Sequence, residues 1–297
     1  MVQKSDRKFQ ILSNIIMMLG TLITVLPFAL LIMSSFTKNT DITLYGYSFI
    51  PRQLSLDAYS YIYRERKQIF SAYMITVLVT AVGTAIGLLM SILYAYVLSK
   101  PHFPGKRFFS LFLFFTMLFN GGLVPTYIMY TQFFHIKNTV FALVIPSLLM
   151  GAFNVILIRS YLQNNIPQAL TEAAFIDGAS EYQIVLKIVF PMAKPIIATI
   201  GLFIGLAYWN DWMNGLYYVT NTKLFSIQQL LTNMMRNIEY LSKNANTNIN
   251  LSNIANGIPQ ATVRMAIAVI GILPILIVYP FVQKYFVKGI SLGAVKG

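Results

Sequence analysis

The sequence predicts an all-α membrane protein that crosses the bilayer six times. Of its 297 residues, 57% are hydrophobic and only 10% are charged, against about 25% charged residues in ordinary soluble domains. A helix needs about 20 apolar residues to cross a bilayer. Six runs meet this length, and we assign all of 1–297 to one transmembrane domain with spans at about 11–34, 71–98, 108–131, 139–162, 194–218 and 263–286.

The first run is expected to remain in the mature protein as a transmembrane helix. Lys4, Arg7 and Lys8 precede an apolar stretch that extends from Ile11 to Met33. A signal peptide has an apolar region of about 7–15 residues and a cleavage site of small residues. This run is longer and shows no such site.

The distribution of basic residues favours a topology with both termini in the cytoplasm. Lys and Arg are enriched on the cytoplasmic side, mainly in short loops. In this topology twelve of the 22 basic residues lie inside, so the plain count decides little. The short turn 100–107 (KPHFPGKR) contributes Lys100, Lys106 and Arg107 and no acid, whereas the predicted outer loops 37–70 and 219–262 are long.

The cytoplasmic loop 163–191 holds a third of the acids, because Glu172, Asp177 and Glu181 are three of only nine in the chain. We expect a helix over 168–177, with Pro167 in its first turn. Gly178 is placed to end that helix. The acids alone fit either a solvated loop or a docking element for a cytoplasmic protein.

A second helix is expected after the glycine. Ser180 and Gln183 have the spacing of a capping box, and Pro191 is expected to end the helix. The spacing i, i+3, i+4, i+7 predicts one apolar face, formed by Tyr182, Val185, Leu186 and Val189.

The spacing in this loop resembles the "EAA" loop of ABC importer permeases. That pattern is EAA, three residues, G, nine residues and I-x-L-P. Here Glu172-Ala173-Ala174 is followed by Gly178 and then by 188–191 (IVFP), with Phe190 in place of Leu. The tail KGISLGAVKG resembles sugar permeases of the maltose type, and FNGGLVPTY at 119–127 is similar to permeases for complex saccharides. The chain is identified as a carbohydrate-importing ABC permease that resembles the second permease of the maltose system.

The resemblance implies a type I importer permease fold and a division of labour among subunits. The chain would be a multi-pass protein of the bacterial cell membrane and one half of a heterodimer with a second permease. Two ATPase subunits and an extracytoplasmic binding protein that delivers a carbohydrate, of the oligosaccharide class, would complete the transporter. No G-x-x-x-x-G-K-[ST] loop is present, so ATP would be bound by the partner and this subunit needs no cofactor and is no enzyme.

The resemblance also gives the loop residues roles in coupling to the ATPase. Glu172 can form a charge-assisted hydrogen bond with a basic group of the partner. Ala173 and Ala174 are small enough for a helix to enter a cleft, Asp177 belongs to the same acidic surface, and Gly178 permits the turn.

A polar stretch near the outer end of the fifth predicted span is a candidate for the translocation path. An ionisable residue within a span is a functional hypothesis by default, and Asp211 lies between both tryptophans of the chain. An aromatic belt at the outer interface explains the same residues, and both interpretations stay open. The candidates are Trp209, Asn210, Asp211, Trp212 and Asn214.

The third predicted span is interrupted by Asn120, Gly121, Gly122 and Pro125. Such breaks within the bilayer mark a binding site or gate, or close packing of helices through glycine. We favour the path or gate, and Asn154 on the fourth span could face the same cavity.

The outer loop 219–262 contains an apolar helical stripe, which could pack on the permease or face the binding protein. The resemblance to maltose-type permeases favours the binding protein. The residues of the stripe are Leu230, Leu231, Met234, Met235, Ile238 and Leu241.

Other classes of function fit the sequence less well. The chain has no cysteine and two distant histidines, His102 and His135, so thiolate or histidine-rich metal sites are not expected. The net charge of +13 is spread between apolar runs and does not form a nucleic-acid-binding stripe. An ion-coupled carrier, with Asp211 as the sole clear coupling group, and an ABC permease for a non-sugar solute remain as alternatives.

Overall fold

The computed structural model describes residues 4–244 and 258–294, and within these residues it is helical, as predicted. The β-pairing within these residues amounts to one isolated bridge between Thr37 and Leu54. The chain divides into two compact units, one formed by Met1–Lys67 with Leu231–Pro274 and the other by Gln68–Leu230 with Ile275–Gly297. Each unit is described by itself.

The first unit contains α1 (Lys4–Ser35), α2 (Asn39–Tyr45), α3 (Asp57–Arg64), most of α14 (Ile227–Asn244) and the first part of α16 (Gln260–Ala294). α1 is apolar and none of its most hydrophobic stretch is buried, which suits a helix that meets lipid or another subunit. The loop after α1 folds back, because Phe36 stacks on Tyr59 at 4.9 Å. Asn39 Oδ1 accepts the amides of Ala261 and Thr262 at the start of α16.

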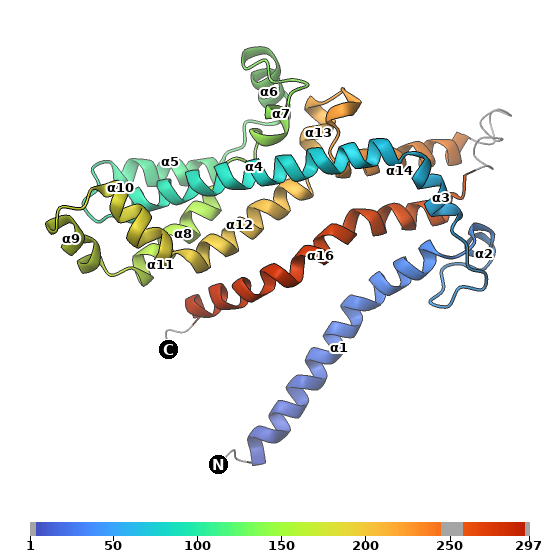
Figure 1. The fold of residues 1–297 in the computed structure, drawn as a ribbon, viewed down its shortest axis with the longest axis horizontal. Coiled ribbons are helices and arrows are strands. Elements are labelled where there is room, and N and C mark those ends of the chain that lie inside the picture. Colours follow the sequence, from blue (N-terminus) through green and yellow to red (C-terminus); the bar gives the residue numbers. More distant parts are fainter. Residues whose placement is uncertain (1–3, 245–257, 295–297) are drawn as a thin grey trace. The chain divides into compact units, whose positions relative to one another are not determined.

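The second unit begins with the 34-residue helix α4 (Arg66–Ser99). The helices that follow are α5 (Lys106–Leu118), α6 (Leu123–Ile128), the π-helix η1 (Met129–Phe133), α7 (Phe141–Val144), α8 (Ala152–Asn165), α9 (Gln168–Ile176), α10 (Glu181–Ile184), the π-helix η2 (Val185–Val189), α11 (Phe190–Met192), α12 (Lys194–Trp209), α13 (Met213–Tyr218) and the 3₁₀-helix η3 (Thr222–Leu224). Figure 1 shows α9 and α10 near the end of α4 that carries Ser99.

Glycines let α4 approach the rest of the second unit closely. A Cβ on Gly83 would lie 2.4 Å from Cζ of Tyr208 in α12, and one on Gly87 would lie 2.6 Å from the carbonyl oxygen of Leu149. The Tyr208 ring is 2% exposed and its hydroxyl donates to the carbonyl of Val144 at 2.7 Å. The core of the unit therefore holds α4, α12 and the segment before α8 in fixed contact.

Three described helices are long and apolar enough to cross a membrane, over Phe9–Ser35, Arg66–Ser99 and Gln260–Val278. Two bent pairs bring the number to five: Lys106–Leu118 with Leu123–Phe133, bent by 111°, and Glu181–Met192 with Lys194–Trp209, bent by 81°. The break in the third predicted span is thus confirmed. The number of six spans and their orientation stay predictions.

The fourth and fifth predicted spans are also discontinuous. Over 139–162 the helix stops after Val144 and resumes at Ala152. Pro146 lacks an amide hydrogen, and Ser147 has a φ of 62°, outside the right-handed helical region. Over 194–218, residues 210–212 separate α12 from α13.

The apolar stripe of α14 is largely covered by the chain itself. Leu230, Leu231 and Ile238 are buried, whereas Met235 is 40% exposed. The expectation that this stripe faces the binding protein is wrong for the three buried residues.

Candidate functional site

The loop 163–191 folds as two short helices joined by a glycine turn. α9 ends at Ile176, and Gly178 follows with a φ of +82°. Three backbone hydrogen bonds close the turn, from the amides of Asp177, Gly178 and Ala179 to the carbonyls of Ala173, Phe175 and Ala174, at 2.9–3.0 Å. The predicted end of the helix is confirmed, although Pro167 lies just before α9 and not in its first turn.

The predicted capping box begins the second helix. Ser180 Oγ accepts the amide of Gln183, and Gln183 Oε1 accepts the amide of Ser180 at 2.9 Å. The helix does not end at Pro191, which lies in the first turn of α11. The helical backbone continues from η2 into α11, because Val189 and Phe190 both have right-handed helical angles. The sharp bend follows at Ala193.

The predicted apolar face of this second helix is wrong in two positions. Tyr182 and Leu186 are 72% and 45% exposed, whereas Ile184, Val185 and Val189 are buried. Residues Val185–Val189 form a π-helix, in which hydrogen bonds join residues five apart. The 3.6-residue period on which the prediction rests therefore does not apply.

In contrast, α9 is uncovered, and none of its residues is buried. Glu172, Ala173, Asp177 and Gly178 are exposed, and Ala174 packs against the core. Phe175 and Ile176 are 65% and 83% exposed. Apolar side chains gathered beside carboxylates form a surface suited to another protein.

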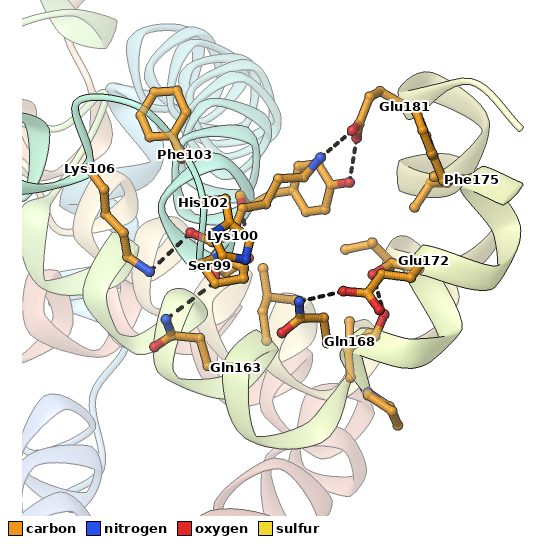
Figure 2. A pocket seen from close by; sticks show the side chains of 18 of the residues that line it. Ser99, Lys100, His102, Phe103, Lys106, Gln163, Gln168, Glu172, Phe175 and Glu181 are labelled. Carbon is orange, nitrogen blue, oxygen red and sulfur yellow. Dashed lines mark hydrogen bonds and ion pairs between the residues drawn. The ribbon is translucent and has the colours of Figure 1, made fainter.

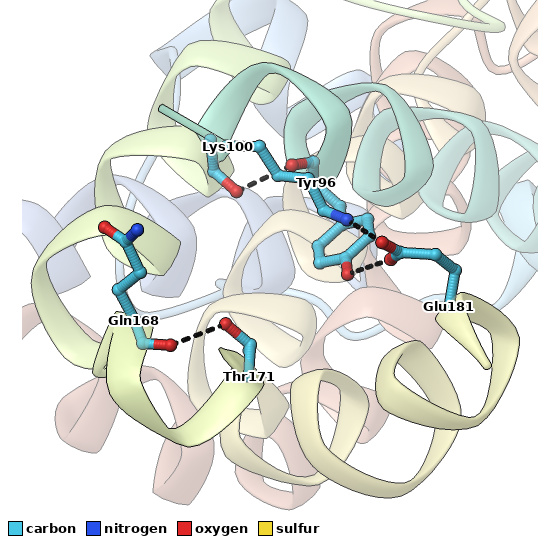
Figure 3. A network of polar contacts seen from close by, with 6 residues as sticks. Tyr96, Lys100, Gln168, Thr171 and Glu181 are labelled. Carbon is cyan, nitrogen blue, oxygen red and sulfur yellow. Dashed lines mark hydrogen bonds and ion pairs between the residues drawn. The ribbon is translucent and has the colours of Figure 1, made fainter. Parts of the chain in front are cut away.

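Glu181 ties the second helix to the end of α4 (Figure 3). Tyr96 donates its hydroxyl hydrogen to Glu181 Oε2 at 2.7 Å, and Lys100 Nζ forms an ion pair with Glu181 Oε1. Lys100 Nζ also lies 4.9 Å from the centroid of the Tyr96 ring, a cation–π contact. In the sequence, Lys100 is recognisable only as a topology signal, and no pattern points to Tyr96.

A cavity of about 1080 Å³ opens between the turn after α4 and the loop (Figure 2). Lys106 Nζ donates to the carbonyl of Lys100 at 3.0 Å, and Gln163 donates to that of Ser99 at 3.4 Å. Glu172 accepts a hydrogen bond from Gln168 of its own helix. The cavity lies between the α4–α5 turn and α9, and Tyr96, Lys100 and Glu181 are part of its lining.

The carboxyl of Glu181 is held in its charged form. The hydrogen bonds from Lys100 and then from Tyr96 lower its pKa below the ordinary value of 4.5. A lowered pKa adds stability that is complete above the ordinary value and is lost as the pH falls through the folded-state pKa. We expect the difference in thermal midpoint between wild type and Glu181→Gln to be constant from about pH 8 to about pH 5.5, to shrink as the pH falls below about 4.5, and to vanish below the folded-state pKa. A difference that shrinks between pH 8 and pH 6 would contradict this assignment.

The stretch 209–214 lies against the break in the fourth predicted span. Asp211 Oδ1 accepts the amides of Met213 and Asn214 at 3.1 and 3.2 Å and thereby caps α13. The buried Asn214 donates to the carbonyl of Pro146 at 3.0 Å. Trp209 and Trp212 are half-buried, with the Trp209 ring 6.4 Å from that of Tyr73, and Asn210 is exposed.

The other candidates make local contacts. Asn120 Oδ1 accepts the amide of Gly122 at 2.9 Å, and Gly122 has a φ of +83°. Gly121 is exposed, and Asn154 is half-buried beside Gly151.

A junction that the sequence did not predict lies at the far end of η1. Asn138, with a φ of 58°, accepts the amides of Thr220 and Asn221 at 2.7 and 3.0 Å. Nearby, the rings of Tyr127 and Tyr218 stack at 5.8 Å. The only signal in the sequence is that asparagine tolerates a positive φ better than most residues.

Residues 87–292 match the family described as "binding-protein-dependent transport system inner membrane component", and the chain belongs to this family. It is a multi-pass membrane subunit of an ABC importer, not an enzyme, and such importers work with an ATPase and a binding protein. The predicted family is confirmed, and a carrier that works alone is excluded.

Relatives match over nearly their full length. The polygalacturonan/rhamnogalacturonan transport system permease protein YtcP of Bacillus subtilis (strain 168) is 36% identical over 98% of this chain and 99% of its own. Protein LplC of the same organism is 34% identical over 99% and 97%. A solved chain of a bacterial ABC transporter involved in the import of the acidic polysaccharide alginate is 30% identical, with a TM-score of 0.79 over 96% of this chain and 99% of that chain. The permease fold is therefore confirmed.

Proposed function

We propose that this permease imports an oligosaccharide as one half of a heterodimer with a second permease. The observation that carries the proposal is the full-length similarity to a polygalacturonan/rhamnogalacturonan permease, joined by the likeness to an alginate importer. Both named substrates are polymers of sugars that bear carboxylates, so acidic oligosaccharides are the first class to test. The chain would cross the bacterial cell membrane six times, with both ends in the cytoplasm.

The loop 163–191 would couple the permease to its ATPase. The exposure of α9, with Glu172 and Asp177 beside Phe175 and Ile176, supports this role. The carboxylates would meet basic groups of the ATPase, and the apolar side chains would lose their contact with water on docking.

Reconstitution of the transporter tests the proposal. The chain is co-expressed with the second permease, ATPase and binding protein encoded beside it, and the complex is placed in liposomes. We expect ATP-dependent uptake of oligogalacturonides or alginate oligosaccharides in an assembly with two ATPase copies. Uptake of peptides but of no saccharide, or an active complex that contains this permease alone, would overturn it.

The translocation path would include the stretch 209–214, the break at 120–122 and Asn154. Asp211→Asn tests the first of these, because asparagine keeps the Oδ1 atom that caps α13 and loses only the charge. We expect an intact complex with uptake slowed at least tenfold, because a hydrogen bond to a charged group contributes about 1.5–3 kcal/mol, a factor of about 10–150 in rate.

The matched control is Asp57→Asn, which removes the same charge from the exposed first turn of α3. Its uptake should equal that of the wild type. Normal uptake in Asp211→Asn as well would assign Asp211 to capping alone.

A further inference from the structure

We propose that Glu181 is a positioning residue that connects the coupling loop to α4, so that a movement of α9 reaches α4 as well as α12. The proposal rests on the proposed coupling function of the loop. It adds a second route of transmission, through side chains, to the direct connection of the loop with α12 through Ala193.

The first step is that α9 and the start of α10 form one connected piece. Backbone hydrogen bonds close the turn at Gly178, and the capping box fixes Ser180 to Gln183. Ile184 and Val189, which are 2% and 1% exposed, anchor the same helix in the core. A force on α9 is therefore passed to Glu181 without a loose joint between them.

The second step is that Glu181 is held by two donors from a single helix end. Its two oxygens accept separately, one from Tyr96 and the other from Lys100, which lies just after the last residue of α4. Tyr96 is 8% exposed, so its hydroxyl has a fixed position. Two bonds to separate oxygens of one carboxylate fix its orientation as well as its distance.

The third step is that α4 packs closely against other parts of its unit. At Gly83 and Gly87, α4 approaches Tyr208 and Leu149 so closely that no space is left for a Cβ. Farther along α4, Thr76 accepts the amide of Ile227 at the start of α14 at 2.8 Å. Because packed interiors transmit strain, a shift at Lys100 reaches the opposite part of this unit.

The other two acids of the loop have different surroundings. Glu172 bonds to Gln168 within α9, and Asp177 is exposed at the end of that helix. Both are available to the ATPase, whereas Glu181 faces α4. The three acids, close in sequence, thus divide into a docking pair and one internal link.

The test compares transport with hydrolysis in the reconstituted complex. We expect Glu181→Gln and Lys100→Met to bind the ATPase normally and to hydrolyse ATP, with uptake per ATP lowered by up to about fivefold, the range of a partly exposed ion pair. Tyr96→Phe, which keeps the ring in the core, should lower the same ratio. The double variant Lys100→Glu with Glu181→Lys restores the ion pair but not the hydrogen bond from Tyr96 to a carboxylate, so it should recover part of the lost uptake per ATP.

The matched control is the ion pair of Glu239 and Lys243 in α14. The side chains of Glu239 and Glu181 are both 55% exposed. Glu239→Gln should leave the ratio unchanged. Wild-type uptake per ATP in Glu181→Gln and Tyr96→Phe would overturn the proposal. It would also be overturned if the charge exchange recovered none of the lost uptake per ATP. Glu172→Ala separates the two hypotheses, because normal ATPase binding in that variant would count against the docking role and not against the link.

Discussion

Gly178→Val is expected to uncouple ATP hydrolysis from uptake while the membrane helices still fold. Gly178 has a φ of +82°, a region that β-branched residues hardly enter. The strain of about 1–2 kcal/mol opposes the turn that orients α9 relative to α10. A Cβ at this position meets no atom within 4 Å, so the effect is due to the backbone alone. The equilibrium constant for the native turn should fall by a factor of about 5–30, and ATPase binding and uptake per ATP measure the loss.

Gly178→Asn is the matched control, because asparagine enters the left-handed region more readily than other side chains do. It should retain most of the coupling that the valine variant loses. Equal loss in both variants would show that bulk on the docking surface, and not the backbone angle, determines the effect.

The features that the sequence predicted correctly depend on neighbouring residues. The end of α9 at Gly178 and the capping box of Ser180 and Gln183 are decided within four residues, and both follow from general rules on backbone angles and caps. The break after Leu118 follows in the same way from two glycines. The family follows from the fixed offsets of the EAA pattern.

The features that escaped prediction depend on residues distant in the chain or on an altered helical period. Glu181 meets Lys100 and Tyr96, which are 81 and 85 residues away, and no local pattern connects them. The π-helix over Val185–Val189 rotates the buried face, which left Tyr182 and Leu186 exposed. The break at Pro146 lies within an apolar run, where hydropathy alone suggested an unbroken span.

Gly83→Ala is expected to prevent normal assembly of the second unit. The new methyl group would lie 2.4–2.7 Å from three carbons of the Tyr208 ring. That ring cannot turn away, because it is 2% exposed and bonded to Val144, so α4 and α12 must separate. Overpacking costs about 1–3 kcal/mol, which exceeds the gain of up to about 1 kcal/mol in helix propensity. The folded yield in detergent and the thermal midpoint should both fall, the midpoint by about 2–4 °C for each kcal/mol lost.

The control for this variant is Gly201→Ala in α12, where a Cβ would lie 3.5 Å from Cδ2 of Leu88, an ordinary contact. This variant gains the same helix propensity without a clash, so its midpoint should equal or exceed that of the wild type. The two substitutions differ only in the space that the fold leaves beside each glycine. If Gly83→Ala were as stable as Gly201→Ala, α4 and α12 could separate at little cost, and α4 would be too loosely packed to transmit movement from Glu181.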